Sequence, residues 1–450
     1  MLWLLFISCT EQKEEPKSTD QIPSSEQRNG DPERGKEYLL YGDYIGSGIP
    51  KDVYDGYFGP TSFNPLGRTG PSASIPYVFN LFDAPNGVEV VGGINCFGCH
   101  TSVVDGEFYI GVGNAFSDYT QDESGNYAFL NNQIASDYGT DSPEWEAYRR
   151  LGESSVQIGE HIVTPFAGIN PAFALEEAAV QYRNPSTLLR EEEPIFELGS
   201  SGASDTPPWW HIQKKNALYY NGVGRGDMSK LIMQICVVGV WDTDHAVQID
   251  ENFPDVLAYL MDIQPPSYPG EIDEVKALEG EQLFAQHCVQ CHGTYGETET
   301  YPNRLITLDE IGTDPKLAKA YINDPGFLTW LQDSWFAQEP YPATFIAEEG
   351  YIAPPLDGIW VTAPYLHNGS IPTLSALLDS TKRPAFWRRD FESSEYDHEA
   401  VGWPYEETDG PFDKQTYNTT RSGYSNVGHT YGDGLSSVER DALIEYLKTL

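Results

Sequence analysis

The stretch that decides the fold is GEQLFAQHCVQCHG, residues 280–293. Two residues separate Cys288 from Cys291, and His292 follows directly. In a C-x-x-C-H motif the two thiols attach to the vinyl groups of one haem, and the adjacent histidine reaches the iron. Residues 274–287 have a helical pattern that leads straight into this motif. The sequence therefore predicts a helix that ends at a covalently bound haem.

A second copy of the motif, CFGCH at residues 96–100, contains Cys96, Cys99 and His100. A zinc site would need another Cys or His pair close by, which neither copy has. A thioredoxin-like site would usually lack the histidine after the second cysteine. Two copies in one chain therefore predict two covalent haem c groups, with His100 and His292 as the iron ligands that the motifs supply.

The distribution of Pro and Gly predicts a domain boundary at residues 264–273, QPPSYPGEID. This short linker would join an N-terminal haem c domain over 35–263 to a C-terminal cytochrome c domain over 274–450. The predicted fold class is mainly α: two cytochrome c-like domains, each with one covalently bound haem, joined by a Pro-rich linker, with extensive loops. Helices are predicted over 143–161, 170–183, 227–241, 255–263, 274–287 and 436–450.

The first nine residues, MLWLLFISC, form an apolar run that ends in a small residue followed by Cys9. This order is similar to a bacterial lipoprotein signal, in which the cysteine is lipidated. The run is too short to span a bilayer, and residues 10–34 have the polar composition of a flexible tether. The sequence thus predicts export to the periplasm or cell surface, with membrane contact only through a lipid anchor at Cys9. A cleaved secretory signal with an incidental cysteine is the alternative.

The surface charge limits the choice of partners. The chain has 68 acidic and 27 basic residues, a formal net charge of −41. The negative electrostatic field of such a chain repels nucleic acid and anionic lipid, which argues against nucleic-acid binding. The partners that we expect are a small redox protein or a small-molecule electron donor or acceptor.

The choice of the second axial ligand of the C-terminal haem is narrowed by elimination. No Met occurs after His292, so the candidates in this domain are histidines. His429 is preferred because the glycines that flank its loop let the backbone approach a porphyrin face. His367 is the alternative. His398 lies in an acidic run that is typical of a solvated surface.

The distal ligand of the N-terminal haem is left open by the sequence. Trp209, Trp210 and His211 form an aromatic cluster and are the candidates for a catalytic role near this haem, although core packing is the ordinary explanation for such tryptophans. Arg225 is a candidate for assisting O–O cleavage, and Cys236 is predicted to be a buried free thiol. The side chains between the first motif and the linker that could bind the iron are His161, His211, His245, Met228 and Met233.

A family resemblance rests on residues 353–376, APPLDGIWVTAPYLHNGSIPTLSA. This segment resembles the signature near the second haem of bacterial di-haem cytochrome c peroxidases and their relatives, which share A-P-Y-x-H-x-G-S. The longer form, followed by S-N-x-G-H-x-Y-G over residues 425–432, looks most like the rubber oxygenase branch. Residues 274–450 also resemble a small cytochrome c domain.

The resemblance implies a division of labour between the two haems. The N-terminal haem would be the reaction site, with an open or exchangeable distal position. The C-terminal haem would have two protein ligands, the second being His429, and would transfer electrons. The resemblance also implies that Trp209 or Trp210 lies near or between the haems, and that a calcium ion sits between the domains.

The function that we expect is that of an exported di-haem c-type cytochrome oxidoreductase. It would activate peroxide or O2 at the N-terminal haem and transfer electrons through the C-terminal haem. One alternative is an electron-transfer cytochrome that has no substrate. Another is oxidative cleavage of an apolar alkene, as the rubber oxygenase branch implies.

Overall fold

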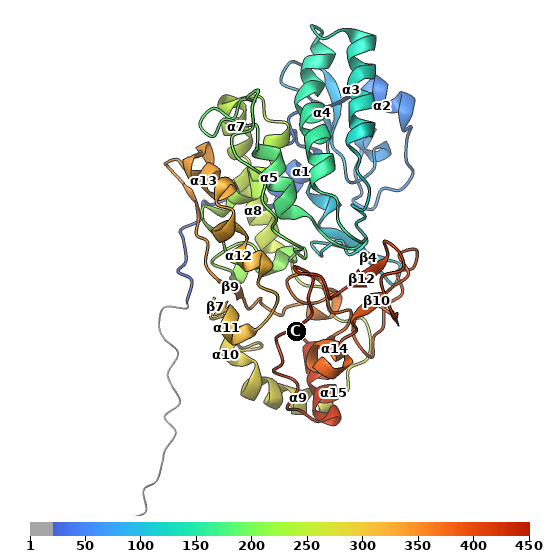
Figure 1. Cartoon of the computed structure of the whole chain (residues 1–450), viewed down its shortest axis with the longest axis vertical. Coiled ribbons are helices and arrows are strands. Elements are labelled where there is room, and N and C mark those ends of the chain that lie inside the picture. The colour runs from blue at the N-terminus through green and yellow to red at the C-terminus, as the bar shows by residue number, and fades with distance from the viewer. Residues whose placement is uncertain (1–20) are drawn as a thin grey trace, which may run out of the picture.

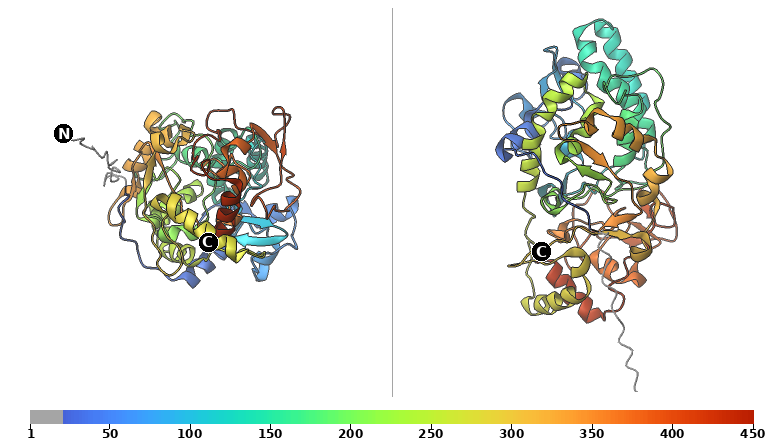
Figure 2. Two further views of the ribbon diagram at one scale, coloured as in Figure 1. Left: turned by 90° about the horizontal axis from the view of Figure 1, so that it is seen from below. Right: turned by 90° about the vertical axis from the view of Figure 1, so that its left-hand side faces the viewer.

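A computed structural model describes residues 21–450 of the chain (Figure 1). The predicted lipidation site at Cys9 and residues 10–20 of the predicted tether lie outside this range. The body is elongated, with helices α3 and α4 at one end and α9 and α15 at the other (Figures 1 and 2). Within residues 21–450, no helix has the length and apolar character needed to cross a membrane.

Helices form most of the regular structure, and the strands are short. The helices are α1 (Pro32–Tyr41), α2 (Lys51–Tyr57), α3 (Ser124–Tyr138), α4 (Pro143–His161), α5 (Ala172–Val180), α6 (Met228–Met233), α7 (Thr243–Asp250), α8 (Phe253–Asp262), α9 (Glu274–His287), α10 (Val289–His292), α11 (Leu308–Ile311), α12 (Lys316–Asn323), α13 (Gly326–Asp333), α14 (Leu374–Leu378) and α15 (Ser437–Leu447).

The strands pair in small antiparallel sheets with the orders β1-β3-β2, β11-β10-β12, β4-β5, β6-β8 and β7-β9. Their bounds are β1 (Gly48–Pro50), β2 (Leu81–Asp83), β3 (Glu89–Gly92), β4 (Thr101–Val104), β5 (Glu107–Ile110), β6 (Gly224–Gly226), β7 (Leu305–Thr307), β8 (Ala343–Phe345), β9 (Gly350–Ile352), β10 (Phe386–Arg388), β11 (Glu406–Glu407) and β12 (Thr416–Asn418).

Helices α9 and α15 pack side by side and support the second C-x-x-C-H motif (Figure 2). Asp273 caps α9 by accepting hydrogen bonds from the first turn, and Ser436 and Glu439 form a capping box at the start of α15. Gly280 allows the close approach, because an added Cβ would lie 2.0 Å from the carbonyl oxygen of Ala442. This pair of helices fixes the position at which α10 and its histidine begin.

The predicted boundary at 264–273 lies between α8 and α9, but it does not separate two hydrophobic cores. Helices α12 and α13 pack into the core of the N-terminal half, where Tyr321 contacts Phe173 with ring centroids 5.3 Å apart. Strand β6 pairs with β8 in the same way across the boundary. Conversely, Trp210 of the N-terminal half is buried in the core that contains α15 of the C-terminal half. The apolar faces of α12 and α13 are therefore buried against the N-terminal half.

Residues 21–34 differ from the predicted flexible tether. Ile22 is buried and its N–H donates to the carbonyl of Asn303 at 2.8 Å. Arg28 forms ion pairs with Asp227 at 2.8 Å and with Asp250 at 2.6 Å. The polar composition of this segment suggested solvation, but its charged and amide groups bond to the folded body instead.

Two predicted helices are shorter in the structure than in the prediction. The apolar run 227–241 begins as α6 and continues as a 3₁₀ turn over Gln234–Val238. Helix α5 begins at Ala172, and Asn170 donates its side-chain amide to Thr206 instead of capping the helix. At the start of α5 a tertiary hydrogen bond therefore overrides the local helical signal.

The ion pairs of Arg28 give a prediction about stability. Arg28→Ala leaves Asp227 and Asp250 close together without a cation, so the free energy of unfolding should fall by about 2 kcal/mol. Arg34→Ala is the matched control, because that side chain is 69% exposed in its pair with Asp255 and should cost less than about 1 kcal/mol. Urea unfolding measures both. Equal losses would contradict the prediction.

Candidate haem-binding sites

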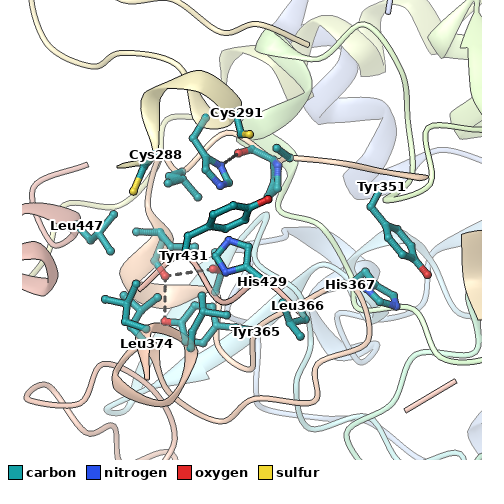
Figure 3. A pocket seen from close by; sticks show the side chains of 18 of the residues that line it. Cys288, Cys291, Tyr351, Tyr365, Leu366, His367, Leu374, His429, Tyr431 and Leu447 are labelled. Atoms are coloured by element: carbon teal, nitrogen blue, oxygen red, sulfur yellow. Dashed lines mark hydrogen bonds between the residues drawn. The ribbon is translucent and has the colours of Figure 1, made fainter. Parts of the chain in front are cut away.

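A large cavity adjoins the second C-x-x-C-H motif, with an empty volume of about 1410 Å³ including its mouth (Figure 3). Cys288, Cys291 and His292 line it, as does His429 from the loop before α15. The remaining wall is mainly apolar, which suits the faces of a flat, largely hydrocarbon cofactor. Apolar side chains that line it include Phe284, Leu356, Ile359, Leu374, Leu377, Leu378, Leu435, Leu443 and Leu447.

His292 is held in the orientation that a metal ligand needs. It ends α10, and its Nδ1 lies 2.8 Å from the carbonyl oxygen of Pro354. A carbonyl accepts a hydrogen bond, so Nδ1 carries the proton and Nε2 keeps a free lone pair. Burial lowers the pKa of His292, which keeps the ring neutral and able to bind a metal.

His429 faces His292 across the cavity. The two ring centroids are 6.3 Å apart, with an angle of 65° between the ring planes. A metal that bonds one nitrogen of each ring at about 2 Å would hold the ring centroids about 6 Å apart. Burial lowers the pKa of His429 to about 3, so this ring is also neutral. The pair has the spacing of two axial ligands of one metal ion.

His367 lines the same cavity in another part of it (Figure 3). Its ring stacks on Tyr351 with centroids 3.9 Å apart and an angle of 18°. Burial lowers its pKa to about 3, and its Nε2 has no hydrogen-bond partner among residues 21–450. Of the two histidines predicted as candidates, His429 is the one whose ring contacts that of His292.

The first C-x-x-C-H motif forms a 3₁₀ turn over Cys96–Gly98, capped by the side chain of Asn95. The hairpin of β4 and β5 follows directly after His100. Burial raises the pKa of Cys96 to about 12 and raises that of Cys99, so both groups are thiols at neutral pH. Burial also lowers the pKa of His100 to about 3. The site therefore presents two thiols and a neutral imidazole.

The segment that begins at Trp209 runs from one motif to the cavity at the other. The Trp209 ring stacks on His100 with centroids 4.9 Å apart and an angle of 24°. Trp210 donates from Nε1 to the carbonyl oxygen of Asp357 at 2.7 Å, and Nε2 of His211 lies 3.0 Å from the same oxygen. His211 lines the cavity of His292. The three consecutive aromatic residues thus contact both candidate sites.

The other sequence candidates near the first motif are mostly engaged elsewhere. Met228 and Met233 are buried in the core shared by both halves. His245 accepts a hydrogen bond at Nδ1 from the backbone of Trp241. His161 ends α4, and its buried Nε2 has no partner within the described chain. Nε2 of His245 is likewise buried without a partner in residues 21–450, so both of these histidines keep an unengaged ring nitrogen.

Three further predictions concern single side chains, and a fourth concerns calcium. Arg225 pairs with Glu348 at 2.9 Å. Cys236 is fully buried, as predicted. His398 is partly exposed and pairs with Asp105 at 2.6 Å. Residues 21–450 contain no group of three or more His, Cys, Asp or Glu placed to hold a metal ion, so calcium stays an expectation from the resemblance alone.

Two residues in the surroundings of the cavity were not singled out from the sequence. Asp357 binds Lys214 through its carboxylate at 2.6 Å and binds Trp210 through its carbonyl. Arg383 bonds to the loop that carries His429. Asp357 lies inside the quoted 353–376 segment, which was a usable signal, whereas no local pattern distinguishes Arg383.

A comparison with known protein families supports the prediction that the chain contains a cytochrome c domain. Residues 350–388 match the family described as RoxA-like, cytochrome c-like. Two uncharacterized proteins of Sinorhizobium fredii (strain NBRC 101917 / NGR234) are similar to the chain. Protein y4iM is 29% identical over 296 residues, which cover 55% of this chain and 64% of that protein. Protein y4iJ is 32% identical over 253 residues, which cover 42% of this chain and 41% of that protein.

Both matches span less than two thirds of the length of these relatives. The family match supports a cytochrome c of the rubber oxygenase-like branch. A cytochrome c-like domain implies covalently bound haem c. The matched residues include His367 and Tyr351 and lie against the large cavity.

The spacing of the His292 and His429 rings predicts that His429 is the second iron ligand of the C-terminal haem. In the dithionite-reduced holoprotein, His429→Ala should add about one CO-binding haem per chain, because CO takes the place of the lost imidazole. His367→Ala is the matched control and should leave CO binding as it is in the unaltered protein. Optical CO titration measures both. The reverse result would assign the ligand to His367.

Proposed function

We propose that this protein is an exported di-haem c-type cytochrome oxidoreductase. It would use peroxide or O2 as its oxidising substrate at the His100 site and transfer electrons through the His292 site. The proposal rests on the cytochrome c-like match, on the two C-x-x-C-H motifs and on the opposed His292 and His429 rings. The opposed rings of His292 and His429 are the observation that supports different roles for the two sites.

The residues of the second motif fit covalent attachment of haem, and the first motif offers the same residue types at the same spacing. Each thiol would add its sulfur and its hydrogen across one vinyl double bond, which forms a thioether without a leaving group. Cys288 and Cys291 line the cavity beside His292, so both sulfurs and the imidazole border the same space. The bound haem would supply an iron that changes oxidation state and, where a coordination position is free, binds the oxidant.

At the His292 site the protein would favour electron transfer. His292 and His429, both neutral and at the observed spacing, would together hold the iron and so leave no position for substrate. The apolar wall excludes water and keeps the surroundings unchanged when the charge of the cofactor changes. Both features suit a site that exchanges electrons only.

At the His100 site the protein would favour reaction with the oxidant. His100 would hold the iron, while Met228 and Met233 are buried in the core. Burial of both methionines favours an open position at this iron, with His161 and His245 as the remaining candidates for a second ligand. Trp209 and the two residues after it would carry electrons between the sites.

The match to the RoxA-like family favours a second candidate reaction, the oxidative cleavage of an apolar alkene with O2. It differs from peroxidase action in its oxidant and in its organic substrate. A pure electron-transfer cytochrome is the remaining alternative. For all three functions we infer that the protein acts in the periplasm or at the cell surface, anchored through Cys9, with a small redox protein or small molecule as electron partner.

The optical spectrum of the dithionite-reduced holoprotein, before and after CO, tests the proposal. We expect CO to bind one of the two haems, because only the His100 site has an open position. Turnover with peroxide and with O2 plus an apolar alkene then separates the two reactions. If neither haem binds CO, both irons are closed by protein ligands, and electron transfer without a substrate replaces the proposed function.

The stacking of Trp209 on His100 gives a prediction about the rate of electron transfer. Trp209→Phe should retain both haems but slow electron exchange between them about tenfold, which corresponds to about 1.4 kcal/mol of barrier. Trp360→Phe is the matched control, since this buried indole donates to the carbonyl of Pro266 and does not contact His100 in the observed ring pairs. Rapid photoreduction followed by absorbance measures the exchange. Equal rates in the two variants would contradict the role of Trp209.

A further inference from the structure

The loop that carries His429 is bound by a single arginine from another part of the chain. Arg383 follows a 3₁₀ turn over Ser380–Lys382. Its Nη1 donates to the carbonyl oxygens of Asn426 at 2.8 Å and Gly428 at 2.6 Å. Its Nη2 donates to the carbonyl oxygen of His429 at 2.9 Å. Three carbonyls within four consecutive residues are therefore oriented toward one guanidinium.

The same guanidinium also binds helix α14. Nε donates to the carbonyl oxygen of Ala376 at 3.2 Å, and Nη2 donates to that of Leu377 at 2.9 Å. A guanidinium has five N–H donors in a fixed planar arrangement. The five hydrogen bonds of Arg383 match this number and link α14 to the His429 loop. The ammonium of a lysine has only three donors at one point and cannot span both elements.

The backbone at His429 needs such external support. Its φ is +45°, in the left-handed region, which is strained for a residue other than glycine. Gly428 before it has a φ of +77°, and an added Cβ would lie 2.3 Å from the backbone of Gly312. The N–H of His429 donates to the carbonyl oxygen of Ile311 at 2.8 Å. Both backbone polar groups of His429 are therefore bonded: its N–H to Ile311 and its carbonyl oxygen to Arg383.

We propose that Arg383 is the positioning residue that keeps the imidazole of His429 opposite His292. The inference deepens the proposed function, because it assumes that His429 is the second axial ligand of the C-terminal haem. Arg383 acts on the backbone and does not touch the ring. Its loss should therefore weaken ligation by His429 without removing the ligand itself.

The decisive variant is Arg383→Gln, which removes the charge and most of the donors. In the reduced holoprotein we expect one additional CO bound per chain, and in the oxidised protein a shift of one haem from low spin to high spin. Millimolar free imidazole should reverse the spin shift, because it occupies the vacated position. A purely structural role for Arg383 would not give a signal that imidazole restores.

Arg440→Gln is the matched control. Arg440 lies in the same region, pairs with Asp379 at 2.9 Å and donates to the carbonyl oxygen of Gly432 at 3.2 Å, and neither of these bonds is to the backbone of residues 426–429. This variant should keep the spin state and CO binding of the unaltered protein. If Arg440→Gln opens the haem to the same extent, the positioning role of Arg383 is overturned.

Two more variants separate failure of this inference from failure of the proposed function. If His429→Gly stays low-spin and gains no CO site, His429 is not the ligand and the assumption behind the inference is wrong. If His429→Gly adds a CO-binding haem but Arg383→Gln does not, His429 is the ligand and Arg383 does not position it. Should Arg383→Gln not fold, Arg383→Lys decides: we expect a partial shift to high spin in the oxidised protein that imidazole reverses, and an unchanged haem overturns the proposal.

Discussion

The close approach of His292 and His429 is the constraint on which the C-terminal half of the protein depends. The two rings come from segments far apart in the chain, yet their centroids lie 6.3 Å apart in a buried, apolar cavity. Helix α9 places the first ring, and its packing on α15 relies on Gly280. A loop with positive φ at its tip places the second ring. Neutral imidazoles in an apolar wall are suited to an iron that is shielded from water.

A shared core joins this cavity to the first motif. Helices α12 and α13 lie in the C-terminal sequence but pack on the N-terminal half, while Trp210 is buried with α15. The Trp209–His211 segment is therefore anchored at both sites, by stacking on His100 and by hydrogen bonds to Asp357. This shared packing connects the two motifs through buried contacts, which would suit the proposed electron transfer between them.

The sequence predicted the parts of the site that depend on local chemistry. The motif spacing identified both sets of thiols and histidines, and the absence of a downstream Met left His429 and His367 as the main candidates. The helices next to the second motif were also predicted, since their caps and periodicity are local signals. The shared core, the packed segment 21–34 and the five-bond role of Arg383 were missed, because each depends on partners distant in sequence.

The intact mass of the denatured holoprotein, followed by mapping of its haem peptides, tests the central claim most directly. Thioether bonds survive denaturation, so the account predicts the mass of the processed chain plus two haems. One haem should be found on the peptide with Cys96 and Cys99, and one on the peptide with Cys288 and Cys291. A correctly matured protein with a single haem, or with none, would contradict the two-site account.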